Sequence, residues 1–310
     1  MSKHSAEEFN ELGKNQEWRI KNQVNNVFVR SGMLATGESR HEDKAAHAGD
    51  SHAMAQNTGI HSWGTWHKLQ GEARTFCRFA WQNYGVRNVN QLKPQMVSDF
   101  ARELGARGYS RNSINNYMSG LNRFAVVLDK GLGQGNRGET WAREIASVRG
   151  EVLRSAPRLD TGARSYDRPD ELVASIRGEA YQVVASLQLA CGLRLNDAMK
   201  LRELRDTGSI AHSKGGQTIT PNIPDSTKSA LERLQGSELH VDKAGYLNAL
   251  KNACDVQNTA YYGSHGLRHN YAINQYNSYR AEGMSKAEAL KATAEDMGHH
   301  RTSITLVYLR

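Results

Sequence analysis

The chain lacks long hydrophobic runs. Among its 310 residues, 38% are hydrophobic and no window of 18 residues is wholly apolar, so we expect no membrane-spanning helix and no membrane partner. The opening stretch, MSKHSAEEFNELGK, is polar and does not contain the apolar segment of a secretory signal. These features predict a cytoplasmic protein.

Cysteine is also scarce. The three cysteines, Cys77, Cys191 and Cys254, are far apart and odd in number. That pattern excludes a disulfide framework and does not fit the ligand spacing of a zinc site. We interpret them as reduced thiols, and we expect neither a metal nor another cofactor.

Positive charge is present in excess, and it is concentrated in one segment. The formal net charge is +8, and residues 63–158 alone contain 15 Lys and Arg against 7 Asp and Glu. A concentrated basic segment is typical of proteins that bind a phosphate backbone, because each neutralised phosphate releases counterions. The charge therefore favours a nucleic-acid partner over a basic surface without function.

Apolar residues recur at helical spacing through most of the chain. We expect an N-terminal extension over residues 1–60, partly flexible, a helical domain over 61–157, a linker over 158–168 and a second domain over 169–310. In the second domain, SIAHSKGGQTITPNIP alternates around two glycines, which predicts a hairpin. The predicted fold class is mainly α with a small antiparallel β element.

Two pairs of polar residues in the second domain are three positions apart, so each pair shares one face of a helix. In CGLRLND, Arg194 follows a glycine that ends one helix, and Asp197 could orient its guanidinium. In GSHGLRH, His265 pairs with Arg268, and Ser264 is a candidate cap for the helix start. Each pair alone is commoner as an ordinary surface pair or helix start.

Two further motifs complete the set. In SKGGQ, Lys214 lies at the predicted hairpin tip, and in GHHRTSITLVY, His299 precedes Tyr308 by nine residues. The neighbouring His269 and His300 are interpreted as structural.

Together these stretches resemble the tyrosine recombinases, the family of phage integrases and Xer-type resolvases. The resemblance rests on the order Arg, Lys, His-x-x-Arg, Gly-His and Tyr in the last third of the chain, and it extends over the preceding helical region. It implies a SAM-like core-binding domain followed by a tyrosine-recombinase catalytic domain. The catalytic residues that it implies are Arg194, Lys214, His265, Arg268, His299 and Tyr308, with Asp197 in a supporting position.

The implied chemistry is phosphoryl transfer without a metal. Tyr308 would attack the phosphate and form a 3′-phosphotyrosyl link, which preserves the energy of the phosphodiester. The guanidinium groups of the two arginines can each donate two hydrogen bonds to the non-bridging phosphate oxygens. The histidines can move the phenol proton, and Lys214 would protonate the leaving 5′-oxygen.

The resemblance also implies the partners. Double-stranded DNA would be bound by a tetramer of the chain, in some systems with accessory DNA-bending proteins, so the protein would be associated with the nucleoid. In the basic domain, Arg111, Asn115 and Arg123 are candidates for contacts in the major groove.

Two departures and several alternatives accompany this interpretation. Arg268 and His299 are 31 residues apart, which predicts an extended helix pair or a loop between them that could form a contact between subunits. Only two residues follow Tyr308, so we expect the usual C-terminal exchange contact to be missing or replaced. Integration or excision of a mobile element is the leading hypothesis. The alternatives are an Xer-type chromosome-dimer resolvase, a type IB topoisomerase and a non-catalytic architectural DNA-binding protein.

Overall fold

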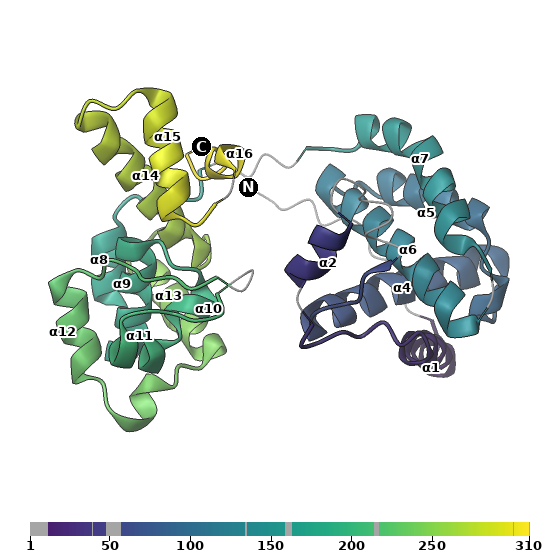
Figure 1. The fold of residues 1–310 in the computed structure, drawn as a ribbon, viewed down its shortest axis with the longest axis horizontal. Coiled ribbons are helices and arrows are strands. Elements are labelled where there is room, and N and C mark those ends of the chain that lie inside the picture. The colour runs from purple at the N-terminus through teal and green to yellow at the C-terminus, as the bar shows by residue number, and fades with distance from the viewer. Residues whose placement is uncertain are drawn as a thin grey trace. The chain divides into compact units, whose positions relative to one another are not determined.

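The computed structural model divides the chain into two compact units, Met1–Asp160 and Thr161–Arg310 (Figure 1). Each unit is described by itself. The structure describes residues 12–38, 40–47, 57–133, 135–158, 163–213, 217–299 and 301–309.

The first unit is mainly helical in its described part, with one parallel β-bridge between Leu34 and Ile60. Its helices are α1 (Lys14–Arg30), α2 (Arg40–Ala46), α4 (Trp63–Tyr84), η1 (Val89–Gln91), α5 (Pro94–Ala106), α6 (Arg111–Leu132) and α7 (Arg137–Ser155). Local chemistry sets several ends. The Ser62 hydroxyl accepts a hydrogen bond from the backbone N–H of Thr65 at the start of α4, and Gly85 ends that helix in the left-handed conformation.

Aromatic side chains from different helices meet in one core. The Phe76 ring of α4 lies 5.4 Å from that of Phe100 in α5 and 5.5 Å from that of Trp141 in α7. Helix α1 belongs to the same core, because its Phe28 ring lies 5.1 Å from Trp66 and 5.9 Å from Phe124. The N-terminal helix is therefore an integral part of this unit's packing.

The second unit consists of shorter helices. They are α8 (Pro169–Ser175), α9 (Glu179–Cys191), α10 (Leu195–Ala198), α11 (Leu201–Thr207), α12 (Asp225–Arg233), η2 (Gly236–Leu239), α13 (Lys243–Val256), α14 (His265–Ala281), α15 (Lys286–Asp296) and α16 (Thr302–Thr305). Most of the buried apolar side chains form one core around α9 and α13. A smaller cluster joins Tyr271 and Ala272 of α14 to Met297 and Tyr308. Figure 1 shows α14, α15 and α16 gathered near the C-terminus.

The predicted small β element is not seen as strands in the described residues. What forms instead is a single antiparallel bridge, in which Ile210 and Ile219 exchange hydrogen bonds of 2.7 and 2.9 Å. Pro221 and Pro224 follow closely and cannot donate to a ladder, which limits the pairing. Lys214 and the two glycines of the predicted tip, residues 214–216, lie outside the described residues.

The predicted capping of α14 by Ser264 is wrong. Ser264 precedes the helix, but its backbone is already helical and its side chain makes no capping hydrogen bond. Other helix limits follow the sequence: Pro94 stands in the first turn of α5, and Gly192 ends α9 in the left-handed conformation.

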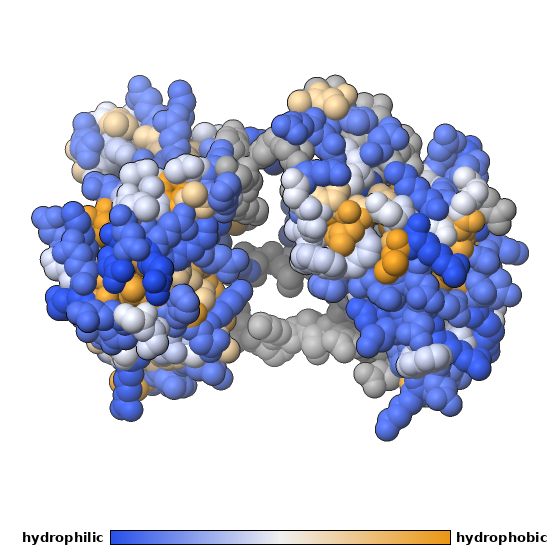
Figure 2. Space-filling view, turned by 60° about the horizontal axis from the view of Figure 1, so that its bottom comes forward, coloured by the Kyte–Doolittle hydropathy of each residue, from blue (hydrophilic) through white to orange (hydrophobic). Residues whose placement is uncertain are grey.

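The surface agrees with the polar composition. Figure 2 shows that the surface of each unit is mainly hydrophilic and that small hydrophobic patches are scattered among the hydrophilic residues. None of the helices in the described ranges has the length and apolar character required to cross a membrane. All three cysteines are buried free thiols.

Candidate active site

The end of helix α9 brings two arginines to one place. Gly192 ends the helix with φ of 61°, and its carbonyl oxygen accepts a hydrogen bond from Nη1 of Arg268. Two residues later, Arg194 stands at the start of α10 and is partly buried. The turn at Gly192 therefore places Arg194 at this site, and the carbonyl oxygen of Gly192 anchors Arg268.

Arg268 is held rigidly on α14. It is 2% exposed, and its Nη2 donates to the carbonyl oxygen of Met297 at 2.7 Å and lies 3.3 Å from Nε2 of His299. Burial lowers the pKa of its guanidinium, although an arginine still carries its charge at neutral pH. Its Nε is buried and has no hydrogen-bond partner among the described residues. A fixed cation of this kind stabilises negative charge that develops nearby.

Tyr308 lies among three histidines. Its phenol oxygen is 3.0 Å from Nε2 of His265. Its ring centroid lies 5.2 Å from that of His265, 4.6 Å from His269 and 5.3 Å from His299. The side chain is only 8% exposed, and the guanidinium carbon of Arg268 lies 5.8 Å from the ring centroid. Segments far apart in the sequence thus bring a phenol, imidazoles and a guanidinium together.

His265 is set to be neutral. Burial is the main cause that lowers the pKa of its imidazole to about 4, and electrostatic repulsion from His269, Arg268, Arg164 and Arg194 lowers it further. At neutral pH the ring is therefore uncharged, and its Nε2 can accept the proton of the Tyr308 phenol.

The tautomer of His299 follows from its neighbours. An arginine can only donate hydrogen bonds, so Nε2 of His299, 3.3 Å from Nη2 of Arg268, must act as the acceptor. The proton then lies on Nδ1, which is 2.9 Å from Oγ1 of Thr305. Thr305 was not identified from the sequence, and its place one helical turn before Tyr308 is the signal that could have found it.

Asp197 has a different partner from the one expected. It is 4% exposed and accepts a hydrogen bond of 2.8 Å from Oγ of Ser213. Across the described ranges, no ion pair joins it to Arg194. Ser213 directly precedes Lys214, which lies outside the described residues. Asp197 thus fixes the side chain of Ser213, the residue before Lys214, and the sequence did not reveal this partner.

A cavity of about 980 Å³ opens beside these groups. Arg194, Arg268 and His299 are among its lining residues, together with residues 217–222 and parts of α14 and α15. An anion in this cavity would meet guanidinium groups from two separate elements. Tyr308 is not among the described residues that line it, so its phenol would have to turn to reach a bound phosphate.

The candidate DNA-reading residues of the first unit all take part in contacts within that unit. Arg123 donates to the carbonyl oxygens of Thr58 and Gly59, and burial lowers the pKa of its guanidinium to about 10. Asn115 accepts a hydrogen bond of 3.0 Å from Nη2 of Arg149, and the backbone N–H of Arg111 donates to Pro157. A DNA contact by any of the three remains a prediction, and Arg123 already has a structural role.

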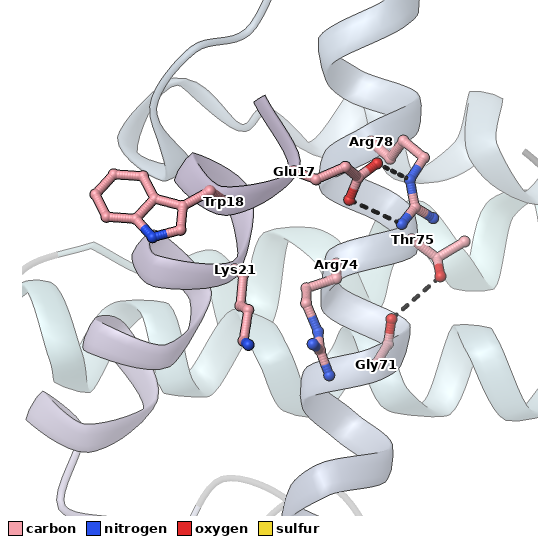
Figure 3. A pocket seen from close by; sticks show the side chains of 7 residues that line it. All are labelled: Glu17, Trp18, Lys21, Gly71, Arg74, Thr75 and Arg78. Carbon is pink, nitrogen blue, oxygen red and sulfur yellow. Dashed lines mark hydrogen bonds and ion pairs between the residues drawn. The ribbon is translucent and has the colours of Figure 1, made fainter. Parts of the chain in front are cut away.

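A second cluster of positive charge lies between α1 and α4 (Figure 3). A pocket of about 350 Å³ is lined there by Trp18 and Lys21 of α1 and by Arg74 of α4, among others. Trp18 is 64% exposed. In the same pocket, Arg78 is held by Glu17 through two hydrogen bonds of 2.7 and 3.1 Å. Lys21 and Arg74 project from facing helices in Figure 3, which makes this pocket a candidate contact for phosphate.

The comparisons with known proteins address the first unit. Residues 56–130 match the family model described as the phage integrase N-terminal SAM-like domain. The match spans α4, η1, α5 and nearly all of α6. No curated protein sequence matches the chain. The resemblance is thus confirmed over the helical region of the first unit, and the motifs of the second unit lie outside the matched residues.

Proposed function

We propose that this chain, which carries a phage integrase SAM-like domain, is a site-specific DNA recombinase that integrates or excises a mobile element. The observation that carries the proposal is the phenol oxygen of Tyr308, 3.0 Å from Nε2 of an imidazole that is neutral at pH 7. A buried arginine lies against the same ring.

The first step is attack by Tyr308 on the scissile phosphorus. The phenol proton passes to Nε2 of His265, the new bond joins the phenol oxygen to phosphorus, and the bond from phosphorus to the 5′-oxygen breaks. Lys214 gives a proton to that leaving oxygen. The products are a 3′-phosphotyrosyl link and a free 5′-hydroxyl.

The second step is the reverse reaction with another strand. The 5′-hydroxyl of a partner duplex attacks the phosphotyrosyl phosphorus, its proton passes to Lys214, and Tyr308 leaves and recovers its proton from His265. Two such rounds exchange both strands through a four-way junction. The number of phosphodiester bonds is unchanged, so no energy source is required.

Charge stabilisation is assigned to the fixed donors. The transition state spreads negative charge over the non-bridging oxygens, and Arg194 and Arg268 meet it from two elements that border one cavity. His299 holds the guanidinium of Arg268 in place through Nε2. Preorganised donors of this kind contribute on the order of 3 kcal/mol each to catalysis.

DNA binding is assigned mainly to the first unit. Its basic excess and its family match both favour that assignment. Subunits would pair at each crossover site and form a tetramer in the synapse, with accessory bending proteins where the site requires them.

The test is a suicide substrate whose cleaved strand releases a short fragment and so traps the covalent adduct. The wild-type protein should form an adduct, while Tyr308→Phe should bind the same DNA and form none. The phenylalanine keeps the ring packing of the apolar cluster and removes only the phenol oxygen. Adduct formation by Tyr308→Phe would refute the proposed nucleophile.

The same assay separates the alternative functions. Absence of any adduct from the wild-type protein would favour an architectural DNA-binding protein. Relaxation of supercoils without strand transfer to a second duplex would favour a type IB topoisomerase. Transfer between two chromosome-dimer resolution sites, but not between attachment sites, would favour an Xer-type resolvase.

A further inference from the structure

The first turn of α14 carries His265 and Arg268, yet it lacks the serine cap that would normally fix such a helix start. A different segment performs that task. Residues 164–166, which lie within the linker expected over 158–168, pack against this turn. The contact joins positions about 100 apart in the sequence.

Asn270 makes the first part of this contact. Its Oδ1 accepts a hydrogen bond of 2.9 Å from the backbone N–H of Tyr166, and its Nδ2 donates one of 2.7 Å to the carbonyl oxygen of the same residue. One amide side chain thus satisfies both backbone groups of Tyr166. Asn270 is only 7% exposed, so neither bond competes strongly with water.

The side chain of Tyr166 makes the second part. It is 2% exposed, and its hydroxyl donates to the carbonyl oxygen of Gly263 at 3.0 Å and accepts from the backbone N–H of Tyr262 at 3.1 Å. Burial raises the pKa of this phenol, so it remains a donor. The loop that enters α14 is therefore tied to the same tyrosine.

Gly266 shows how close the approach is. A Cβ at this position would lie 2.6 Å from Cε2 of Tyr166 and 2.8 Å from the carbonyl oxygen of Arg164. Only glycine allows the segment to lie directly on the helix between His265 and Arg268.

We propose that residues 164–166 are a positioning element of the active site, which fixes the first turn of α14 and hence the orientation of His265 and Arg268. The inference rests on the proposed function for its catalytic meaning. The contacts themselves do not depend on it. Arg164 adds a positive charge to the surroundings of His265.

The charged and titratable groups around His265 come from several elements. They are His269 and Arg268 on α14, Arg164 on the positioning segment, Arg194 at the start of α10, and Tyr308 near the C-terminus. Loosening of the segment would admit water to His265 and raise its pKa from about 4 toward the ordinary value of about 6.5.

The experiment compares Tyr166→Phe with Tyr246→Phe in the full chain. Tyr246 is the matched control, because it is equally buried in the same unit and its hydroxyl donates at 2.8 Å to a buried side chain, Gln188. The His265 titration is followed by NMR of histidine-labelled protein without DNA, with His265→Gln to assign the signal. Tyr166→Phe and Asn270→Ala should raise the pKa of His265, and Tyr246→Phe should leave it unchanged.

Cleavage provides the second readout. At saturating suicide substrate, Tyr166→Phe should slow adduct formation by about tenfold or more, because small displacements of catalytic groups are costly. DNA affinity should stay within about twofold of the wild type, and Tyr246→Phe should cleave at the wild-type rate.

Arg164 has its own pair of variants. Arg164→Gln should raise the pKa of His265, while Arg164→Lys should keep it low.

Two failures can be told apart. If the wild-type protein forms no adduct, the proposed function fails. The NMR titration of His265 still tests whether residues 164–166 position the first turn of α14. If His265 titrates alike in Tyr166→Phe, Asn270→Ala and the wild type, the positioning element is refuted, whatever the protein does to DNA.

Discussion

Replacing Gly192 by alanine should destabilise the second unit more than any ordinary helix-end substitution. Gly192 has φ of 61° and ends α9. A left-handed alanine costs about 1–2 kcal/mol. In addition, a Cβ there would lie 2.3 Å from Cδ1 of Tyr271, and forcing a buried ring aside costs about 1–3 kcal/mol. The total loss in the free energy of unfolding is about 2–5 kcal/mol.

Gly208→Ala is the matched control. Gly208 ends α11 with φ of 68°, but a Cβ at this position would have no atom within 4 Å. It should therefore show only the conformational cost of about 1–2 kcal/mol. The difference between the two variants measures the contact with Tyr271.

The placement of tryptophan makes the assay selective. All five tryptophans lie in the first unit, at positions 18, 63, 66, 81 and 141. In a urea titration, Gly192→Ala should shift the unfolding of the second unit seen by far-UV circular dichroism and leave the tryptophan fluorescence transition in place. Equal losses for Gly192→Ala and Gly208→Ala would refute the reasoning. Gly192→Ala should also slow cleavage, because the carbonyl of Gly192 anchors Arg268.

Three further predictions concern charge and protons. The folded state lowers the pKa of His265 to about 4 from about 6.5, so the unfolded chain binds more protons between these pH values. The free energy of unfolding should therefore be unaffected by His265 above pH 6.5 and decrease as the pH falls from 6.5 to 4. His265→Gln should make this decrease smaller, as measured by circular dichroism melts. Lys214→Ala should slow cleavage more than binding, and a 5′-bridging sulfur should restore the rate, since a thiolate leaves without a proton; no rescue would make Lys214 a DNA contact. DNA affinity, measured by fluorescence anisotropy, should fall steeply as the salt concentration rises. Lys21→Ala or Arg74→Ala should each reduce the slope of log K against log salt concentration by about 0.9. An unchanged slope would mean that the pocket between α1 and α4 does not contact DNA. The exposed Arg143 of α7 serves as the control through Arg143→Ala.

Local signals in the sequence predicted much of the fold. Apolar spacing predicted the helical character of both domains, and the glycine before Arg194 correctly marked the end of α9. The i,i+3 pattern correctly put His265 and Arg268 on one helix. These features depend on neighbours within a few residues, so they can be read without the fold.

Features that depend on distant partners were not predicted. Ser264 has the right residue type for a cap, but the loop before α14 is held by Tyr166, 98 positions earlier in the chain, through Gly263 and Tyr262. The guanidinium of Arg123 is occupied by carbonyl oxygens 64 and 65 residues away. Neither partner leaves a periodic signal in the sequence. The β element was overestimated for a related reason, since alternation around glycines does not reveal how soon the pairing stops.

The packing of α1 has a consequence for anyone who cuts this protein into domains. The family match begins at residue 56, and a fragment designed from that boundary would discard Ile20, Val24, Val27 and Phe28, all buried at 4% exposure or less. Each such side chain contributes about 1.5–3 kcal/mol, so the fragment would lose about 6–12 kcal/mol, as much as the whole stability of many domains. It would also expose the aromatic rings of Trp66 and Phe124 to solvent, and an exposed apolar surface of this kind promotes aggregation. Expression of the first unit alone should therefore begin before α1. If a fragment that starts near residue 60 aggregates, the missing helix explains the aggregation, and the result does not test whether the unit binds DNA.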